Sequence, residues 1–265
     1  YFWDAHTHKS IGMTNFSDVG VIAFSPDSKK IAVSFEDTKC FVLDTKSLLR
    51  LSTLGGKVNG NSVQISTNSD KLLYSSYDTD STRISISIRD LNMDKVSQNL
   101  NSISGYASFA KFYDNDKKVI NFTDSSINII DAENGKFLFK LGEVANPLKK
   151  TELFYSISVS PDNKKIIGRS DDSIRIWNAE NGKILASKKI ESTWGTIPQF
   201  CPIASQDVES SKIIYLSGNG EVQIWNCSLD TMLGKINRIS NDTVHDNNYI
   251  YYRLAKFSED GKYII

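Results

Sequence analysis

Short, mainly apolar runs alternate with polar turn residues along the whole chain. In the stretch 21–51, such runs lie at 21–24, 31–34, 40–43 and 48–51, separated by segments rich in Asp, Ser, Lys and Thr. The runs are rich in Ile, Val, Leu and Phe, and their length is typical of strands and too short for helices. The pattern therefore predicts an all-β chain with four short strands to a unit.

The unit of four runs repeats along the chain. A clear second copy spans 157–186, and further copies span 62–100, 107–141 and 202–236. The third run of each copy ends in Asp or Asn, and the aligned residues follow one another at spacings of 40 to 48 residues: Asp4, Asp44, Asp90, Asp131, Asn178 and Asn226. A period of this length is typical of architectures that repeat one small sheet.

A four-stranded sheet with apolar residues on both faces cannot bury them alone, so neighbouring sheets must stack. Arranged radially, the sheets close into a ring and shield their edges. We predict a single β-propeller domain over 1–265, with about six blade-equivalents of four antiparallel strands. The blades are expected at approximately 17–55, 59–100, 104–142, 151–189 and 197–236, with a split blade formed by 248–265 and 1–13.

The chain begins with Tyr1 and not with Met. We therefore expect it to be part of a longer product. If residues are missing at either end, the chain would instead be part of a seven-bladed ring or of a double propeller.

Three segments carry a family resemblance. Residues 24–31, 159–166 and 257–264 read Phe-Ser-Pro-Asp-Ser-Lys-Lys-Ile, Val-Ser-Pro-Asp-Asn-Lys-Lys-Ile and Phe-Ser-Glu-Asp-Gly-Lys-Tyr-Ile. They resemble the first hairpin of WD40 repeats. The dipeptide that ends the third strand in this family is matched, with the acid or the corresponding amide, by Trp3-Asp4, Trp177-Asn178 and Trp225-Asn226.

The resemblance implies a WD40-like propeller that works as a non-catalytic scaffold for protein–protein interaction, as one subunit of a larger eukaryotic complex. The chain departs from the family in lacking a Gly-His pair, and its histidines, His6, His8 and His245, cannot supply one to each blade. The polar network that the family builds on that pair is therefore expected to be absent from most blades, and other propeller families remain open.

The charge balance bears on partners. Lys and Arg together number 31, as do Asp and Glu, and no run of three basic residues occurs. No global positive field draws the chain to nucleic acid, so other proteins are the expected partners. Three cysteines without CxxC spacing and the absence of a long apolar run favour a reducing, cytoplasmic setting without membrane insertion, where cytoskeletal or ciliary association fits the family.

Candidate chemistry is sparse. His6 and His8 have a spacing that could bind a metal, but they are expected in an exposed hairpin turn, as are the acidic pairs Asp78/Asp80 and Asp171/Asp172. No recognised catalytic motif is present, so we expect no cofactor, no metal and no enzyme activity. The alternative is a propeller enzyme or ligand-binding propeller that uses the central channel; small and apolar first-strand residues such as Ala23, Val63 and Ile157 count against it.

Binding surface is expected in the loops that join the strands, where aromatic and Arg residues make the strongest contacts. The candidates for partner binding are Trp194, Tyr77, Tyr106 and Arg169. For each of them, packing against a neighbouring blade is an equal alternative.

Overall fold

The computed structural model divides into two compact units, Tyr1–Phe139 (unit 1) and Lys140–Ile265 (unit 2). The residues that it describes are 2–4, 6–12, 19–35, 39–54, 57–77, 83–93, 95–99, 103–104, 109–123, 126–141, 154–170, 172–190, 198–202, 212–217, 221–237 and 255–264.

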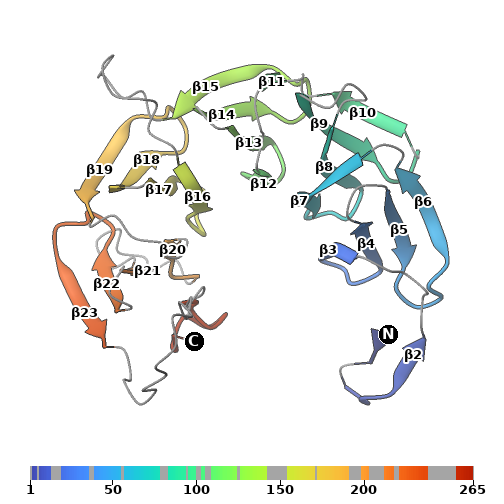
Figure 1. Ribbon diagram of the computed structural model, residues 1–265, viewed down its shortest axis with the longest axis horizontal. Coiled ribbons are helices and arrows are strands. Elements are labelled where there is room, and N and C mark those ends of the chain that lie inside the picture. The colour runs from blue at the N-terminus through green and yellow to red at the C-terminus, as the bar shows by residue number, and fades with distance from the viewer. Residues whose placement is uncertain are drawn as a thin grey trace, which may run out of the picture. The chain divides into compact units, whose positions relative to one another are not determined.

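Unit 1 holds a hairpin and the first three sheets (Figure 1). The hairpin pairs β1 (Phe2–Trp3) with β2 (Ser10–Gly12). Sheet 1 consists of β3 (Val19–Phe24), β4 (Lys30–Phe35), β5 (Cys40–Asp44) and β6 (Arg50–Leu54). Sheet 2 consists of β7 (Lys57–Ile65), β8 (Lys71–Tyr77), β9 (Arg83–Asp90) and β10 (Lys95–Asn99), and the short β11 (Ile103–Ser104) also pairs with β9. Sheet 3 consists of β12 (Phe109–Tyr113), β13 (Lys118–Thr123), β14 (Ser126–Asp131) and β15 (Phe137–Leu141), which runs across the boundary of the units.

Unit 2 holds the other two sheets. Sheet 4 consists of β16 (Phe154–Val159), β17 (Lys165–Ser170), β18 (Ser173–Asn178) and β19 (Ile184–Lys189). Sheet 5 consists of β20 (Gln199–Phe200), β21 (Lys212–Leu216), β22 (Val222–Asn226) and β23 (Met232–Ile236). Near the end of the chain, Phe257 and Ile264 form an isolated antiparallel bridge.

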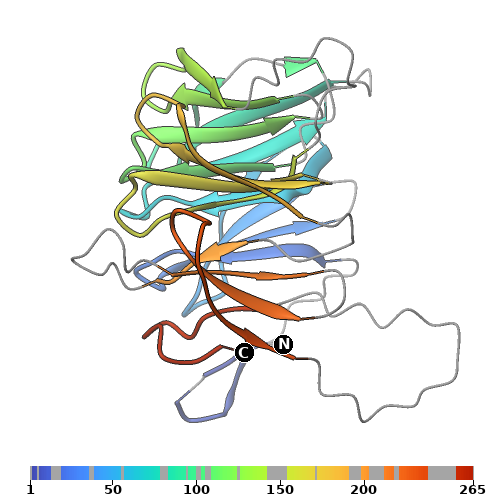
Figure 2. The ribbon, with the colours of Figure 1, turned by 90° about the vertical axis from the view of Figure 1, so that its left-hand side faces the viewer.

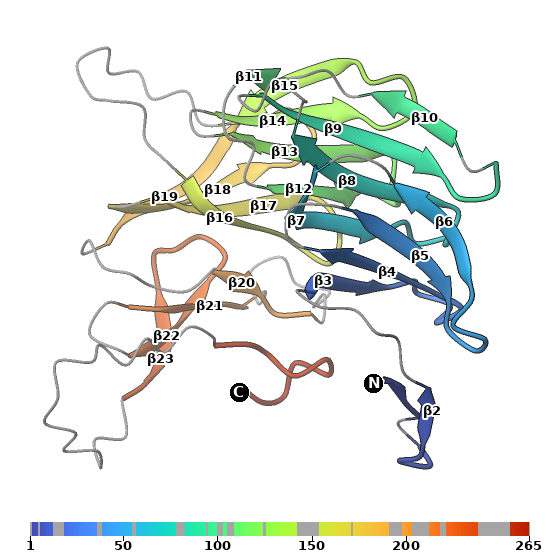
Figure 3. The same cartoon turned by 45° about the vertical axis from the view of Figure 1, so that its right-hand side comes forward.

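The prediction of an all-β chain with four-stranded antiparallel sheets is confirmed. In each sheet the first four strands lie in chain order and neighbouring strands are antiparallel, as can be followed in Figures 2 and 3. The described segments contain no helix, and so none that is long and apolar enough to cross a membrane. Closure of the sheets into a ring stays a prediction.

The core of unit 1 lies between consecutive sheets. Ala32, Val42 and Leu54 of sheet 1 pack against Leu72 and Tyr74 of sheet 2, and all five are almost fully buried. Burying an aliphatic side chain of this size contributes about 1.5–3 kcal/mol. The faces of a single sheet could not obtain this burial alone, so the stacking of sheets stabilises the unit.

Sheets 2 and 3 pack against each other in the same way as sheets 1 and 2; we call each such interface between neighbouring sheets a seam. Leu73 and Ile88 of sheet 2 pack against Val119 and Ile130 of sheet 3. Strand β7 lies beside both β3 and β12, so the first strands of the three sheets adjoin (Figure 1). Adjoining first strands are what radial stacking of sheets requires.

The aligned Asp or Asn at the end of each third strand closes the next turn. The Asp44 carboxylate accepts the backbone N–H groups of Lys46 and Ser47 at 3.1 and 2.7 Å. The side-chain oxygens of four other aligned residues accept the N–H groups two and three residues further on: Asp4, Asp90, Asp131 and Asn178. At Asn226 the side-chain oxygen instead accepts the N–H of Thr231 at 3.3 Å. The alignment thus rests on side-chain to backbone hydrogen bonds that shape the turn.

The turn between the first two strands of sheets 1 and 4 is also built from side chains. Ser25 Oγ donates to the Asp27 carboxylate at 2.7 Å and accepts the Lys30 N–H at 2.8 Å. The hydrogen bond from Ser25, followed by that from the Lys29 N–H, lowers the pKa of Asp27 to about 2. The same two bonds recur at Ser160 with Asp162 and at Ser258 with Asp260. These are the segments that carry the family resemblance.

Candidate functional site

The four predicted partner-binding residues have different places. Trp194 and Tyr106 lie outside the described residues. Tyr77 is the last residue of β8, and its side chain is likewise outside the described part. Arg169 lies in β17, not in a loop, and is only 5% exposed. The burial of Arg169 favours the packing alternative, and partner contact at the other three stays a prediction.

Arg169 marks a cluster of polar and aromatic side chains in the seam between sheets 4 and 5. Its backbone pairs with Ile174 of β18 and Ser156 of β16. Burial raises the pKa of Tyr215, while the hydrogen bond with Trp225 and the positive charge of Arg169 act in the opposite direction. The positive charge of Arg169 in β17 thus acts on the Tyr215 hydroxyl of the adjacent sheet.

One amide oxygen organises the aromatic side chains of the cluster. Tyr215 Oη donates to Gln223 Oε1 at 2.7 Å, and Trp225 Nε1 donates to the same oxygen at 3.1 Å. Tyr215 pairs with Gln223 across β21 and β22, and Gln223 and Trp225 are two residues apart, so all three side chains stand on one face of sheet 5. Tyr215 is 4% and Trp225 8% exposed, so Gln223 provides the acceptor that two buried donors need.

A lysine from sheet 4 closes the cluster. Lys188 Nζ, from β19, lies 3.8 Å from the centroid of the Trp225 ring. An ammonium over the face of an indole is attracted by the ring quadrupole. The half-buried Lys188 thus joins the last strand of sheet 4 to the third strand of sheet 5.

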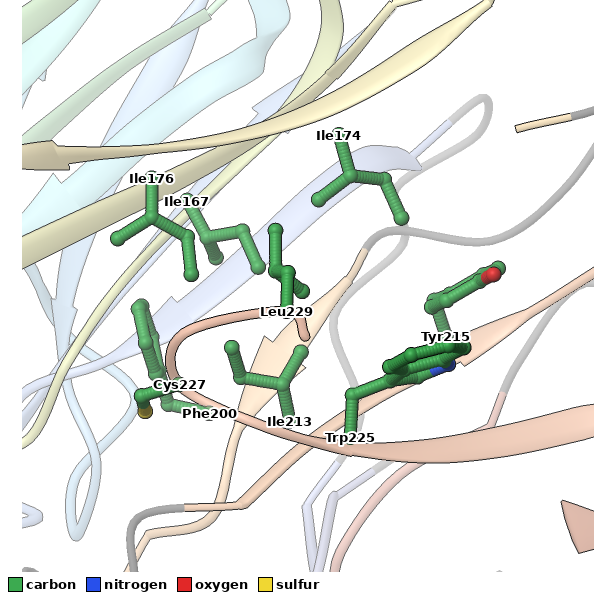
Figure 4. Close-up of a cluster of buried hydrophobic side chains, with 9 residues drawn as sticks. All are labelled: Ile167, Ile174, Ile176, Phe200, Ile213, Tyr215, Trp225, Cys227 and Leu229. Carbon is green, nitrogen blue, oxygen red and sulfur yellow. The ribbon is translucent and has the colours of Figure 1, made fainter. Parts of the chain in front are cut away.

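Tyr215 and Trp225 also belong to a cluster of buried hydrophobic side chains between the two sheets. Figure 4 shows Ile167, Ile174 and Ile176 of sheet 4 above Phe200 and Ile213 of sheet 5. Each of these five is nearly inaccessible to solvent. The seam as a whole has the composition of a domain core, and at one end Gln223 accepts the hydrogen bonds of Tyr215 and Trp225. These contacts hold sheet 4 against sheet 5.

Other candidate groups lie in structural positions. His6 and His8 are exposed in the turn between β1 and β2, where the Asp4 carboxylate accepts the His6 N–H at 2.9 Å. No group of three or more His, Cys, Asp or Glu with the spacing of a metal site occurs in the described segments. Of the acidic pairs, only Asp172 is described, and its carbonyl accepts the Ile190 N–H at 2.9 Å.

The three cysteines are free thiols in the structure. Cys40 and Cys227 are buried and Cys201 is half-buried. Burial raises the pKa of Cys40 to about 12, so this thiol is protonated and unreactive at neutral pH.

Sequence reasoning missed Gln223, Tyr215 and Lys188. The signal was present for the first: Gln223 is two residues before Trp225 in a predicted strand, so both side chains had to share a face. Nothing in the sequence pairs Lys188 with Trp225, because that contact joins two sheets. No protein-family model matches the chain, and no curated protein matches its sequence.

Proposed function

We propose that the chain is a WD40-like β-propeller that serves as a non-catalytic scaffold for protein–protein interaction. The first strands β3, β7 and β12 adjoin within unit 1, and β16 and β20 adjoin within unit 2. Radial stacking of sheets continues this arrangement from one blade to the next.

The proposed ring closes through a blade split between the two ends of the chain. In sheet 1 the Thr45 N–H, just after the aligned Asp44, donates to the carbonyl of Lys29 in the first turn at 3.0 Å. Equivalent bonds join the turns of sheets 2, 3 and 4: Leu91 to Asp70, Ala132 to Lys117, and Ala179 to Lys164. The β1–β2 hairpin has the Asp turn and residues 257–264 have the Ser-Asp turn. Each end thus carries one half of what a complete sheet contains.

The observation that carries the scaffold function is the repetition of one hairpin frame with different connections. The Ser-Asp first turn and the Asp or Asn third-strand turn recur in both units. The connections that lead into β16 and β20 differ in sequence and length. A rigid frame with variable connections is suited to display binding loops without disturbing the core.

We infer further that the protein is one subunit of a larger eukaryotic assembly in the cytoplasm. The likeness of the first hairpins to WD40 repeats supports the assembly, and free cysteines suit a reducing compartment.

The test is intact-complex mass spectrometry with chemical cross-linking on the endogenous full-length protein. A stable assembly, with intermolecular cross-links gathered at the connections between sheets, is the expected result. A lone monomer would contradict the scaffold. It would direct attention to the first strands, where a ligand-binding or catalytic propeller would place its polar residues.

A further inference from the structure

The last strand of a sheet presents an edge. Among the described residues, β6, β19 and β23 each pair with one neighbour only, the third strand of the same sheet. An edge strand offers backbone N–H and C=O groups to an additional strand, and proteins guard such edges or use them for binding.

A leucine recurs at a β-bulge on these edges. Ile176 pairs with Ala186 and Trp177 with Ile184, so Leu185 is the extra residue of β19. The same shift makes Leu51 the extra residue of β6 and Leu233 that of β23. The three leucines are 52%, 50% and 49% exposed. Each edge therefore presents a large apolar side chain at its bulge.

Strand β19 combines this apolar site with positive charge. Strand β19 is labelled in Figures 1 and 3. Its first two residues, Ile184 and Leu185, are about half exposed, and it ends in two lysines, of which Lys189 is exposed and Lys188 lies over the Trp225 ring. The strand contains no acidic residue. By contrast, β23 has one lysine, Lys235, which pairs with Glu221 at 3.1 Å. The charge of β19 is thus the less compensated of the two.

The residues of β19 disfavour pairing between the β19 strands of two copies of the chain. If two β19 strands paired antiparallel, the lysines of one would face Ile184 and Leu185 of the other. If they paired parallel, the lysines would face lysines. Neither arrangement supplies a carboxylate, and like charges on facing strands are destabilising. An edge with these residues fits a partner of different composition.

We propose that the β19 edge binds an extended peptide by strand addition, and that the peptide carries acidic residues at one end and apolar residues at the other. In the antiparallel orientation, the acidic end is N-terminal and faces the exposed Lys189, while the Lys188 ammonium stays over the Trp225 ring. The apolar end faces Ile184 and Leu185, separated from the acidic end by the length of Ala186 and Ser187. The proposal rests on the interaction-scaffold function, to which it adds a site and a partner chemistry.

The experiment selects peptides of about ten residues, the upper length of most strands, from a random displayed library on the full 265-residue chain. The most enriched peptide is then labelled, and its affinity is measured by fluorescence anisotropy. Leu185→Glu is expected to weaken binding by about tenfold or more, because a leucine contact is lost and a carboxylate faces the acidic peptide. Leu51→Glu on β6, at nearly equal exposure, is the matched control and leaves the affinity unchanged. Circular dichroism checks that both variants fold.

Two further readouts separate strand addition from other binding. Lys189→Glu, at an exposed position, weakens the same peptide and reduces the salt dependence of its affinity. A peptide methylated at alternate backbone nitrogens loses binding, because it cannot donate to the edge.

Enrichment of peptides without acidic residues, or equal binding to Leu185→Glu and the parent, would overturn the proposal. So would an absence of enriched peptides together with Leu185-dependent binding to phosphatidylserine vesicles, which would assign the edge to a membrane. An intact cellular assembly that Leu185→Glu leaves unchanged would remove the edge site and leave the scaffold standing. If the cellular protein is a monomer but still binds the enriched peptide, the scaffold function is contradicted and the edge site is retained.

Discussion

The hydrogen bonds to Gln223 allow the stability of the seam in unit 2 to be tested by a double-mutant cycle. Gln223→Leu removes the oxygen that accepts from Tyr215 Oη and Trp225 Nε1 at 2.7 and 3.1 Å. Each such bond contributes about 0.5–1.5 kcal/mol net. We therefore expect Gln223→Leu to lower the free energy of unfolding by about 2 kcal/mol, since leucine is close in size and adds no cavity.

The double-mutant cycle measures how much of this loss in free energy of unfolding comes from the hydrogen bond with Tyr215 and how much from the one with Trp225. Tyr215→Phe removes one donor, so Gln223→Leu in that background should cost less by about 1 kcal/mol. Gln223→Glu keeps an oxygen that accepts from both donors, so it should lower the free energy of unfolding by less than Gln223→Leu does. Free energies come from urea unfolding, followed by tryptophan fluorescence.

Gln199→Leu is the matched control, because Gln199 is half-buried in the same sheet and its side chain makes no hydrogen bond to the described residues. If Gln223→Leu and Gln199→Leu have equal effects, or if Tyr215→Phe leaves the cost of Gln223→Leu unchanged, the reasoning about the seam is refuted.

Three further predictions concern turns and thiols. Ser28 has a φ of 57° at the turn position where Gly261 has 64°, so Ser28→Gly should stabilise the protein by about 0.5–1 kcal/mol in thermal unfolding; a lower melting temperature would contradict this. The pKa of Asp27 is lowered from 3.8 to about 2, so its ionised form stabilises the fold above pH 3.8 and this contribution is lost as the pH falls toward 2. Urea titrations of Asp27→Asn should lack that pH dependence, and identical profiles would refute it. Cys201 should react with a thiol reagent before Cys40, as measured by mass spectrometry of the native protein, and the reverse order would contradict the burial of Cys40.

The repeated strands could be predicted from the sequence because two local signals coincide. Apolar runs such as 31–34 and 40–43 alternate with turn residues whose own side chains form the turns, as Ser25 and Asp44 do. These interactions span five residues or fewer, so they are visible in any copy of the repeat. A local signal that recurs in phase is enough to define the sheets.

The candidate site was less predictable because its contacts join different sheets. Arg169 was expected among the loop residues, but it lies in β17 and its side chain is buried. Lys188 and Trp225 are 37 residues apart in the sequence and meet only when sheets 4 and 5 stack. Burial in a seam depends on the neighbouring sheet, which the pattern of a single strand does not specify.

The central claim is that the five sheets and the two ends of the chain form one closed propeller. Cross-linking mass spectrometry of the full chain with a short lysine-reactive reagent tests it most directly. The account predicts an intramolecular cross-link between Lys9, beside the β1–β2 turn, and Lys262, just after the Ser258–Asp260 turn, because the corresponding turns adjoin in sheets 1 to 4. Cross-links from Lys262 confined to unit 2, with Lys9 linked only within unit 1, would contradict closure.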